Sequence, residues 1–251
     1  MDTLSFITDI CGKLKTLKRT GWIMRQVPLP ESDADHMHRC AMCALLVTQQ
    51  PPDPRDDYSL PEMARFHPSK VNTTRLLRMA VTHDLCEALA GDITPFCNPT
   101  LVASRHDKEQ QAMQAIQRVV GGTLGQELFD LWQEYEALET TEAIYTKDID
   151  KFEMIVQAWE YEKAHLKARH DVAGNPDPQR NSTLPAMRQP GKDGPPPVFD
   201  EPLRTFFITT NSVMKTPLFR RLDGELRQRR EAFLKERGWQ VTDEERQQYT
   251  K

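Results

Sequence analysis

Apolar residues recur at intervals of three and four positions through most of the chain, a spacing that places them on one face of a helix. No alternating run of β-branched residues bounded by turn residues is long enough to predict a strand. The sequence therefore predicts a compact all-α fold. Helices are expected at residues 2–18, 33–49, 70–90, 104–119, 123–138, 141–166, 203–212 and 218–237.

Two of these predicted helices carry clear end signals. Ser32 stands three residues before Asp35, a spacing typical of a capping box, and this places His36 in the first turn of the following helix. The fourth predicted helix ends at Gly121 and Gly122, a pair that seldom continues a helix. Both signals support the helix ends that the apolar spacing gives.

A proline-rich segment interrupts the helical pattern in the last third of the chain. Residues 167–202 contain eight of the 18 prolines, several glycines and few apolar residues. Because this composition cannot bury much apolar surface, we interpret the segment as an insertion or mobile loop in a single domain spanning residues 1–251. Proline-rich segments also dock other proteins, so a protein partner at this segment remains an open alternative.

Composition places the chain among ordinary globular proteins. It has 251 residues, 38% hydrophobic and 28% charged, which suits one domain with a substantial core. It has no apolar run of about 18 residues and no basic-then-apolar start, so we expect a cytoplasmic protein, with the nucleus as an alternative. Five cysteines, an odd number, argue against a disulfide framework.

Charge narrows the range of partners. The net charge is −4, and no segment concentrates lysine and arginine enough to bind along a nucleic-acid polymer. The most basic segment, residues 220–237, alternates basic with acidic residues and predicts a solvated helix face. A small phosphorylated substrate fits this balance better than a nucleic acid or a membrane.

The strongest chemical signal is the dipeptide His83-Asp84 in an apolar stretch predicted to be helical. Two adjacent metal-capable side chains are costly to bury without a partner. His36 and Asp150 also fall on predicted helices. These mixed nitrogen and oxygen donors suit Mn²⁺, Fe²⁺, Co²⁺, Ni²⁺ or Zn²⁺ better than Ca²⁺ or Mg²⁺. The alternative interpretation is an incidental buried polar pair.

Two further carboxylates follow the dipeptide. Glu87 lies one helical turn after Asp84, close to the expected metal, where it is placed to orient or deprotonate a water or to protonate a leaving oxygen. Gly91 and Asp92 then end the predicted helix and place a carboxylate at its mouth. Each of these acids alone would be read as a surface residue, but together they favour a hydrolytic metal site.

Four motifs resemble those of the HD-domain-containing 5'-deoxynucleotidase family, in particular its eukaryotic branch. They are Leu-Lys-Arg-Thr-Gly-Trp at 17–22, Pro-Glu-Ser-x-x-Asp-His at 30–36, His-Asp-x-x-Glu-x-x-x-Gly-Asp-Ile at 83–93 and Asp-Lys-x-Glu-Met at 150–154. The resemblance implies a helical HD-domain fold, usually homodimeric. It also implies hydrolysis of nucleoside 5'-monophosphates with one divalent transition metal per chain.

The resemblance also implies roles for individual residues near the metal. His36, His83, Asp84 and Asp150 match the metal ligands of the family. Glu87 matches its essential carboxylate. We therefore expect Asp84 and Glu87 to take part in catalysis.

The substrate residues implied by the resemblance are less regular. Asp92 matches an aspartate that contacts the substrate near its sugar. Arg19 and Trp22 fall where the family places an arginine-tryptophan pair on the phosphate and sugar, but here two residues separate them. Arg25 is the alternative to Arg19 for the phosphate.

The sequence thus predicts a metal-dependent phosphomonoesterase that releases nucleoside and phosphate. Because no basic cluster is evident beside the expected ligands, monophosphates are favoured over triphosphates. A triphosphohydrolase or a cyclic-nucleotide phosphodiesterase is an alternative, as is action on a 3'-phosphate or modified-sugar nucleotide in a fungal nucleoside-analogue pathway such as that to cordycepin. A non-catalytic nucleotide-binding scaffold is a further alternative.

Overall fold

The computed structural model describes residues 2–48, 51–169 and 199–246. Within these ranges every named element is a helix, and the only extended pairings are two isolated bridges, Lys18 with Ser32 and Leu166 with Phe199. The all-α prediction is therefore confirmed. None of the described helices is long and apolar enough to cross a membrane.

The first half of the chain forms short and medium helices. Their order is α1 (Thr3–Ser5), the π-helix η1 (Phe6–Cys11), α2 (Gly12–Leu14), α3 (Thr20–Met24), α4 (Asp33–Leu46), the 3₁₀-helices η2 (Ala64–Phe66) and η3 (Pro68–Lys70), α5 (Thr73–Thr82), α6 (Glu87–Ala90) and α7 (Pro99–Ala103). The short helices α3 and α7 were not predicted from the apolar spacing.

The second half holds the longest helices. They are α8 (Arg105–Val120), α9 (Gly122–Ala137), α10 (Thr141–His165), α12 (Arg204–Thr209), α13 (Pro217–Glu236) and the 3₁₀-helix η4 (Asp243–Glu245). Each of these five α-helices begins within two residues of the start predicted from the sequence.

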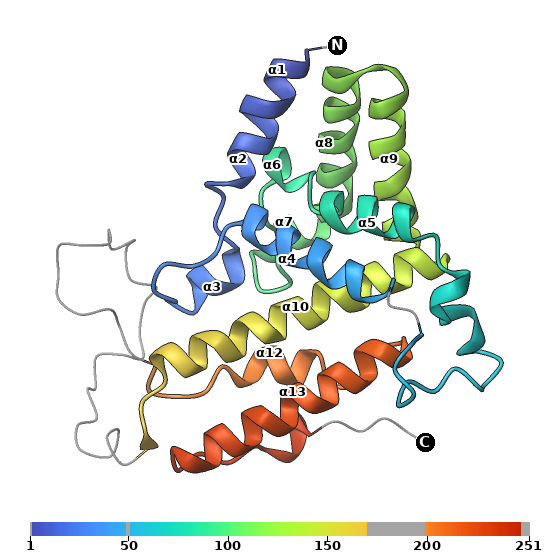
Figure 1. The fold of residues 1–251 in the computed structure, drawn as a ribbon. Helices are drawn as coiled ribbons and strands as arrows, with labels where there is room; N and C mark the ends of the chain where they lie inside the picture. Colours follow the sequence, from blue (N-terminus) through green and yellow to red (C-terminus); the bar gives the residue numbers. More distant parts are fainter. Residues whose placement is uncertain (1, 49–50, 170–198, 247–251) are drawn as a thin grey trace.

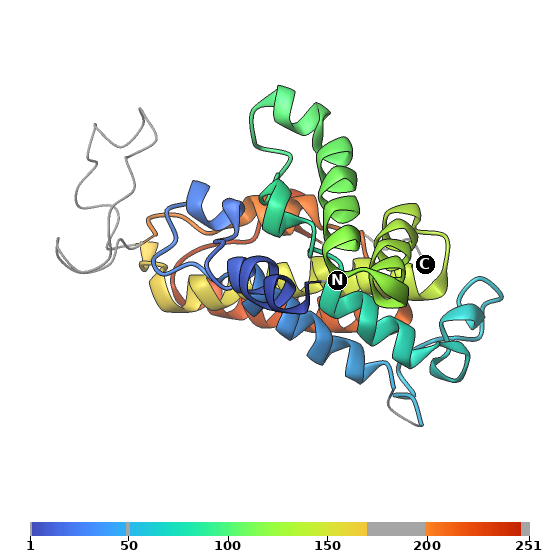
Figure 2. The same ribbon diagram turned by 90° about the horizontal axis from the view of Figure 1, so that it is seen from above.

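Helix α10 is the centre of the fold. It contacts α4, α5 and α9 on one side and α12 and α13 on the other, and Figures 1 and 2 show it running through the middle of the molecule. Consequently α10 has buried residues around much of its circumference, including the polar Thr146, Asp148 and Glu153. Polar groups on this helix must therefore find partners inside the protein.

The end signals of α4 and α8 are present in the structure. Ser32 caps α4 through a capping box with Asp35, and His36 follows as a fully buried residue of the first turn. Helix α8 ends at Gly121, whose φ of +64° is open to glycine at little cost. The capping box fixes where α4 begins and so which face carries His36.

The predicted helix at 70–90 is wrong in its middle. Helix α5 ends at Thr82, and residues 83–86 form a tight turn before α6 begins at Glu87. The Ala80 carbonyl, which would accept from residue 84 in a continuing helix, accepts a hydrogen bond from His83 Nδ1 at 3.0 Å. The side chain thus competes with the backbone ladder at this point.

The prediction of a solvated face for residues 220–237 is also wrong at two charged positions, Asp223 and Arg230, which are buried. Arg230 on α13 is 2% exposed. Its guanidinium donates to both oxygens of Glu162 on α10, at 2.7 and 2.9 Å, and to Glu245 at 2.8 Å. The charge alternation hid a buried ion-pair network that joins α10, α13 and the segment after it.

The proposed insertion lies largely outside the described residues, which omit 170–198. Its flanks are described and lie together. Lys167 N donates to the Phe199 carbonyl at 3.0 Å, and Phe199 N donates to the His165 carbonyl at 2.9 Å. The insertion therefore stays a prediction, with both ends fixed beside the last turn of α10.

Replacement of Arg230 by alanine is expected to lower the free energy of unfolding by about 3–5 kcal/mol, because it leaves the buried Glu162 carboxylate unpaired. Urea denaturation followed by circular dichroism measures the loss. The matched control is Arg229→Ala, an exposed neighbour on the same helix, with an expected change within about 0.5 kcal/mol. Equal midpoints for the two variants would contradict the assigned role.

Candidate metal centre and active site

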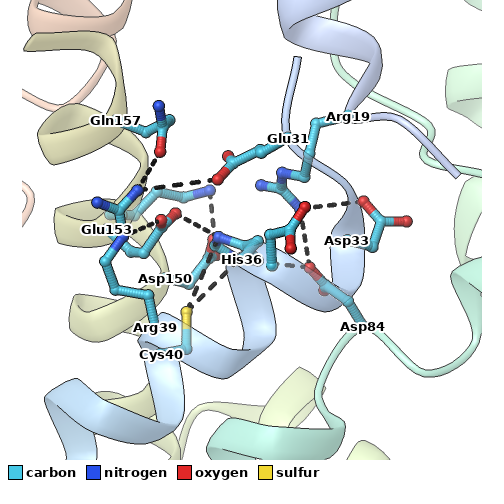
Figure 3. A network of polar contacts seen from close by, with 12 residues as sticks. Arg19, Glu31, Asp33, His36, Arg39, Cys40, Asp84, Asp150, Glu153 and Gln157 are labelled. Carbon is cyan, nitrogen blue, oxygen red and sulfur yellow. Dashed lines mark hydrogen bonds and ion pairs between the residues drawn. The ribbon is translucent and has the colours of Figure 1, made fainter. Parts of the chain in front are cut away.

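Four residues expected to bind metal come together from three parts of the fold. His36 comes from α4, His83 and Asp84 from the turn after α5, and Asp150 from α10. His36 Nε2 lies 3.7 Å from Asp84 Oδ2 and 3.6 Å from Asp150 Oδ1, and Figure 3 shows these three side chains converging. His83 Nε2 lies 3.3 Å from Asp84 Oδ2.

These spacings suit a shared ion. With metal–ligand bonds of about 2.0–2.2 Å, neighbouring ligand atoms of a tetrahedral site lie about 3.4 Å apart. The three separations of 3.3 to 3.7 Å are close to that value. The residues present therefore fit a divalent metal.

The contacts of the two imidazoles at Nδ1 also suit metal binding through Nε2. His83 Nδ1 donates to a backbone carbonyl, and His36 Nδ1 contacts the carboxylate of Glu153. When the rings are neutral and donate from Nδ1, each Nε2 carries the lone pair that a metal would bind. His83 Nε2 is buried and has no hydrogen-bond partner among the described residues, which is costly unless something else binds it.

The carboxylate of Asp150 is held on the side away from His36. Its Oδ2 accepts from the Tyr135 hydroxyl at 3.0 Å and lies 3.4 Å from Lys147 Nζ and 3.3 Å from Lys151 Nζ. Burial disfavours the charged form, but the two lysines keep the pKa of Asp150 well below its usual value. Oδ1 is thereby left facing His36.

A basic cluster therefore surrounds the candidate ligands, contrary to the expectation from the sequence. It consists of Arg19, whose Nη1 is 3.0 Å from Asp84 Oδ2, together with Lys147 and Lys151. The two lysines belong to α10, where spacing alone did not connect them to phosphate chemistry. Arg19 contacts a candidate ligand directly, and both lysines contact Asp150 on the side away from His36.

Glu87 lies in a second group of carboxylates, with the buried Asp33 and the half-buried Asp92. Glu87 is 6% exposed, and its Oε2 and both oxygens of Asp33 have no hydrogen-bond partner among the described residues. Burial, with Asp84 and Asp92 nearby, raises the pKa of Glu87 well above its usual value, and burial raises the pKa of Asp33 to about 7. This cluster could hold protons or a second cation.

Asp33 is a residue that the sequence did not single out. An aspartate at the first position of a helix is common because it interacts favourably with the helix dipole. That ordinary explanation predicts an exposed side chain, whereas Asp33 is fully buried and lies 3.9 Å from Arg19 Nη1. Its burial depends on tertiary packing, which local sequence does not report.

Asp92 and Arg19 lie next to this cluster. Asp92 Oδ2 accepts from Thr20 N at 2.6 Å, and the Asp92 carbonyl accepts from Thr20 Oγ1 at 2.8 Å. These bonds attach the start of α3 to the loop after α6 and keep Arg19 beside Asp84. In the described structure Asp92 thus positions the start of α3. Its expected contact with substrate stays a prediction.

Trp22 and Arg25 lie away from the candidate ligands. Trp22 is 1% exposed, donates from Nε1 to Glu31 at 2.8 Å and packs against Tyr161 and Phe206. Arg25 is exposed and donates to Thr205 Oγ1 at 3.1 Å. Of the cations considered for the phosphate, Arg19 is the one in contact with a candidate ligand.

Two hollows flank the centre. One, of about 460 Å³, is lined by Leu29, Glu31, Asp35, His38, Arg39, Gln157 and Tyr161. The other, of about 350 Å³, is lined by Val102, Ala103, Arg105, His106, Glu109, Tyr135, Glu136, Leu138 and Lys147. The second adjoins the centre, because two of its lining residues, Tyr135 and Lys147, contact Asp150.

A sequence model of the HD domain matches residues 11–184, well over half of the chain, and the chain therefore belongs to the HD domain family. Within it, the 5'-deoxynucleotidase HDDC2 of Dictyostelium discoideum is 45% identical over 154 residues, which cover 61% of this chain and 75% of that protein. These matches confirm the resemblance drawn from the four motifs.

Two other relatives carry the same kind of name. The human 5'-deoxynucleotidase HDDC2 is 37% identical over 158 residues, covering 63% of this chain and 68% of that protein. The 5'-deoxynucleotidase hdd1 of Schizosaccharomyces pombe is 38% identical over 159 residues, covering 62% and 70%. The family implies a divalent metal, in agreement with the donor set described above.

A divalent ion should stabilise this fold, because it would satisfy His83 Nε2 and offset the buried carboxylates. At a free concentration 100 times its Kd, an ion bound only by the folded protein adds about 2.7 kcal/mol. Differential scanning fluorimetry of chelator-treated protein, with and without Mn²⁺ or Zn²⁺, measures the rise in Tm. His83→Ala should lose most of this rise, while the exposed control His38→Ala should keep it.

Proposed function

We propose that this protein is a metal-dependent phosphomonoesterase that hydrolyses nucleoside 5'-monophosphates to nucleoside and inorganic phosphate. The observation that carries the proposal is the buried Nε2 of His83, which has no hydrogen-bond partner among the described residues and faces Asp84 beside His36 and Asp150. The names of the relatives support the same activity. A nucleotide-binding scaffold has no need of an open metal site with unpaired buried donors.

The metal in this proposal is one divalent transition ion per chain, with Mn²⁺, Co²⁺, Fe²⁺, Ni²⁺ or Zn²⁺ all compatible with the donors. His36, His83, Asp84 and Asp150 would hold it. When bound, such an ion lowers the pKa of a water molecule and offsets charge on the phosphoryl group.

The surrounding side chains would stabilise the phosphate charge and protonate the leaving oxygen. Arg19, Lys147 and Lys151 face the phosphate oxygens and offset their charge, in keeping with their contacts to Asp84 and Asp150. Water oxygen forms a bond to phosphorus as the bond from phosphorus to the 5'-oxygen breaks. Glu87, whose burial favours the protonated carboxyl, gives its proton to that leaving oxygen.

Glu87→Gln should keep its metal and lose activity. Removal of a general acid or base costs about 10²- to 10⁴-fold in rate. Phosphate release from dAMP measures kcat, and elemental analysis measures the bound metal. The matched control is Glu139→Gln, an exposed acid on the surface, which should behave as wild type. A Glu87→Gln variant with normal kcat would remove this residue from the mechanism.

Substrate choice is tested with AMP, dAMP, 3'-AMP and dATP in the presence of Mn²⁺ or Co²⁺. We expect phosphate release from the 5'-monophosphates and little from dATP, in keeping with the names of the relatives, although the basic residues beside the ligands mean that charge alone does not exclude a triphosphate. Release of triphosphate or pyrophosphate from dATP with inert monophosphates would instead establish a triphosphohydrolase. Turnover of 3'-AMP alone would favour the 3'-phosphate or modified-sugar alternative, and no turnover with any metal would favour a scaffold.

The assembly and location of the protein are further parts of the proposal. We expect a homodimer in the cytoplasm, and the exposed apolar side chains of Met42, Leu45 and Leu46 on α4 are compatible with a protein interface. The proline-rich segment remains the site considered for a different protein partner.

A further inference from the structure

Glu153 lies on α10 one turn after Asp150, and both of its oxygens are occupied. The residue is fully buried. Its Oε2 contacts His36 Nδ1 and its Oε1 accepts from Arg39 Nε at 2.8 Å, as Figure 3 shows. The carboxylate therefore connects a candidate metal ligand on one side to a cation on the other.

The contact with His36 decides which imidazole nitrogen faces the site. A carboxylate is only an acceptor when ionised, so it keeps the proton of His36 on Nδ1. The lone pair of the neutral ring is then on Nε2. This atom lies 3.7 Å from Asp84 Oδ2 and 3.6 Å from Asp150 Oδ1. Outer carboxylates of this kind orient metal-binding histidines and raise their basicity.

The two histidines are treated differently. His83 has a neutral partner, the Ala80 carbonyl, whereas His36 has a charged one. The carbonyl is fixed by the last turn of α5, but the carboxylate of Glu153 is on a long side chain and has to be held. The His36 contact is therefore the one that depends on additional residues.

Arg39 provides that support. It lies three residues after His36 on α4, and besides Glu153 it donates to Glu160 Oε2 at 2.7 Å and contacts Gln157, both on α10. Its planar guanidinium has several donors in fixed directions, so these bonds restrain the position of Glu153. The side chain of Arg39 also lines the larger hollow and is 29% exposed.

A competing assignment would use Glu31, His36 and Glu153 as ligands of a separate cation, since their donor atoms lie close together. The guanidinium of Arg39 already occupies that position. It is 3.8 Å from Glu31 Oε2 and 2.8 Å from Glu153 Oε1. A metal there would face an arginine charge, so the carboxylate of Glu153 acts on His36 and not on an ion of its own.

We propose that Glu153 is a positioning residue that fixes the proton of His36 on Nδ1 and that Arg39 holds Glu153 in place for this task. The inference rests on the proposed metal site, but it concerns a residue that would not touch the metal. Its effect should appear in metal affinity before any effect on chemistry.

The test compares Glu153→Gln with Glu160→Gln. Glutamine at 153 has a single carbonyl oxygen for two donors, His36 and Arg39, so one contact must be lost. Isothermal titration of chelator-treated protein with Zn²⁺ should show a Kd about 10- to 100-fold weaker for Glu153→Gln. Glu160→Gln keeps a carbonyl oxygen that can accept from Arg39 and does not touch His36, so its Kd should stay near that of wild type.

A second readout addresses the proton itself. Long-range proton–nitrogen NMR spectra of the Zn²⁺-loaded protein distinguish which nitrogen of each histidine carries hydrogen. Wild type should show His36 protonated on Nδ1, and Glu153→Gln should show exchange between the two forms or their reversal. Unchanged tautomer and unchanged Kd in Glu153→Gln, with only a lower Tm of the metal-free protein, would reduce Glu153 to a structural role and overturn the proposal.

The failure modes can be separated. If wild type binds no divalent ion, the proposed function and this inference both fall. If wild type binds Zn²⁺ and hydrolyses dAMP with Mn²⁺ while Glu153→Gln binds equally well, only the inference falls. Should Glu153→Gln not fold, Arg39→Gln replaces it, and the proposal requires that this variant also bind Zn²⁺ more weakly than Glu160→Gln.

Discussion

Acidic side chains are buried where α4, the turn after α5 and α10 meet, and an ionised carboxylate there is costly unless a positive charge faces it. The acids concerned are Asp33, Asp84, Glu87, Asp150 and Glu153. Part of this negative charge is offset by ion pairs with basic side chains, namely Arg19, Arg39, Lys147 and Lys151. A divalent ion held by His36, His83, Asp84 and Asp150 would offset the rest of it.

The candidate metal ligands are held in position in two different ways. Helix ends and a turn present His83 and Asp84, whose positions are set by the backbone, while long helices carry His36 and Asp150, whose positions are set by neighbouring side chains. The central place of α10 allows it to serve both needs, because it contacts both α4 and α9. Tyr135 reaches Asp150 across that second contact.

The sequence predicted the metal-facing residues because their types and order are local features that resemble a known family. It did not predict Glu153, Tyr135 or Lys147 as members of the site, because their partners are brought by tertiary packing. His36 and Glu153, for example, are 117 positions apart. The helix break at 83–86 was missed for a related reason, since the apolar pattern continues through it and the cause is a side-chain bond to the Ala80 carbonyl. Arg230 was misjudged because alternating charge gives no sign of depth.

The bridge between Leu166 and Phe199 has a consequence for how this protein can vary. Leu166 and Phe199, the residues on either side of the intervening segment, lie next to each other. The rest of the fold therefore already holds the two ends of this segment together. Under these conditions each doubling of loop length adds only about 0.6 kcal/mol of closure entropy. The point of departure is also 16 residues along α10 from Asp150, a distance of about 24 Å at the rise of a helix. Residues added or removed between 167 and 198 therefore change the length of the protein without changing the register of the helix that carries Asp150, and homologues are free to differ most in size at this position.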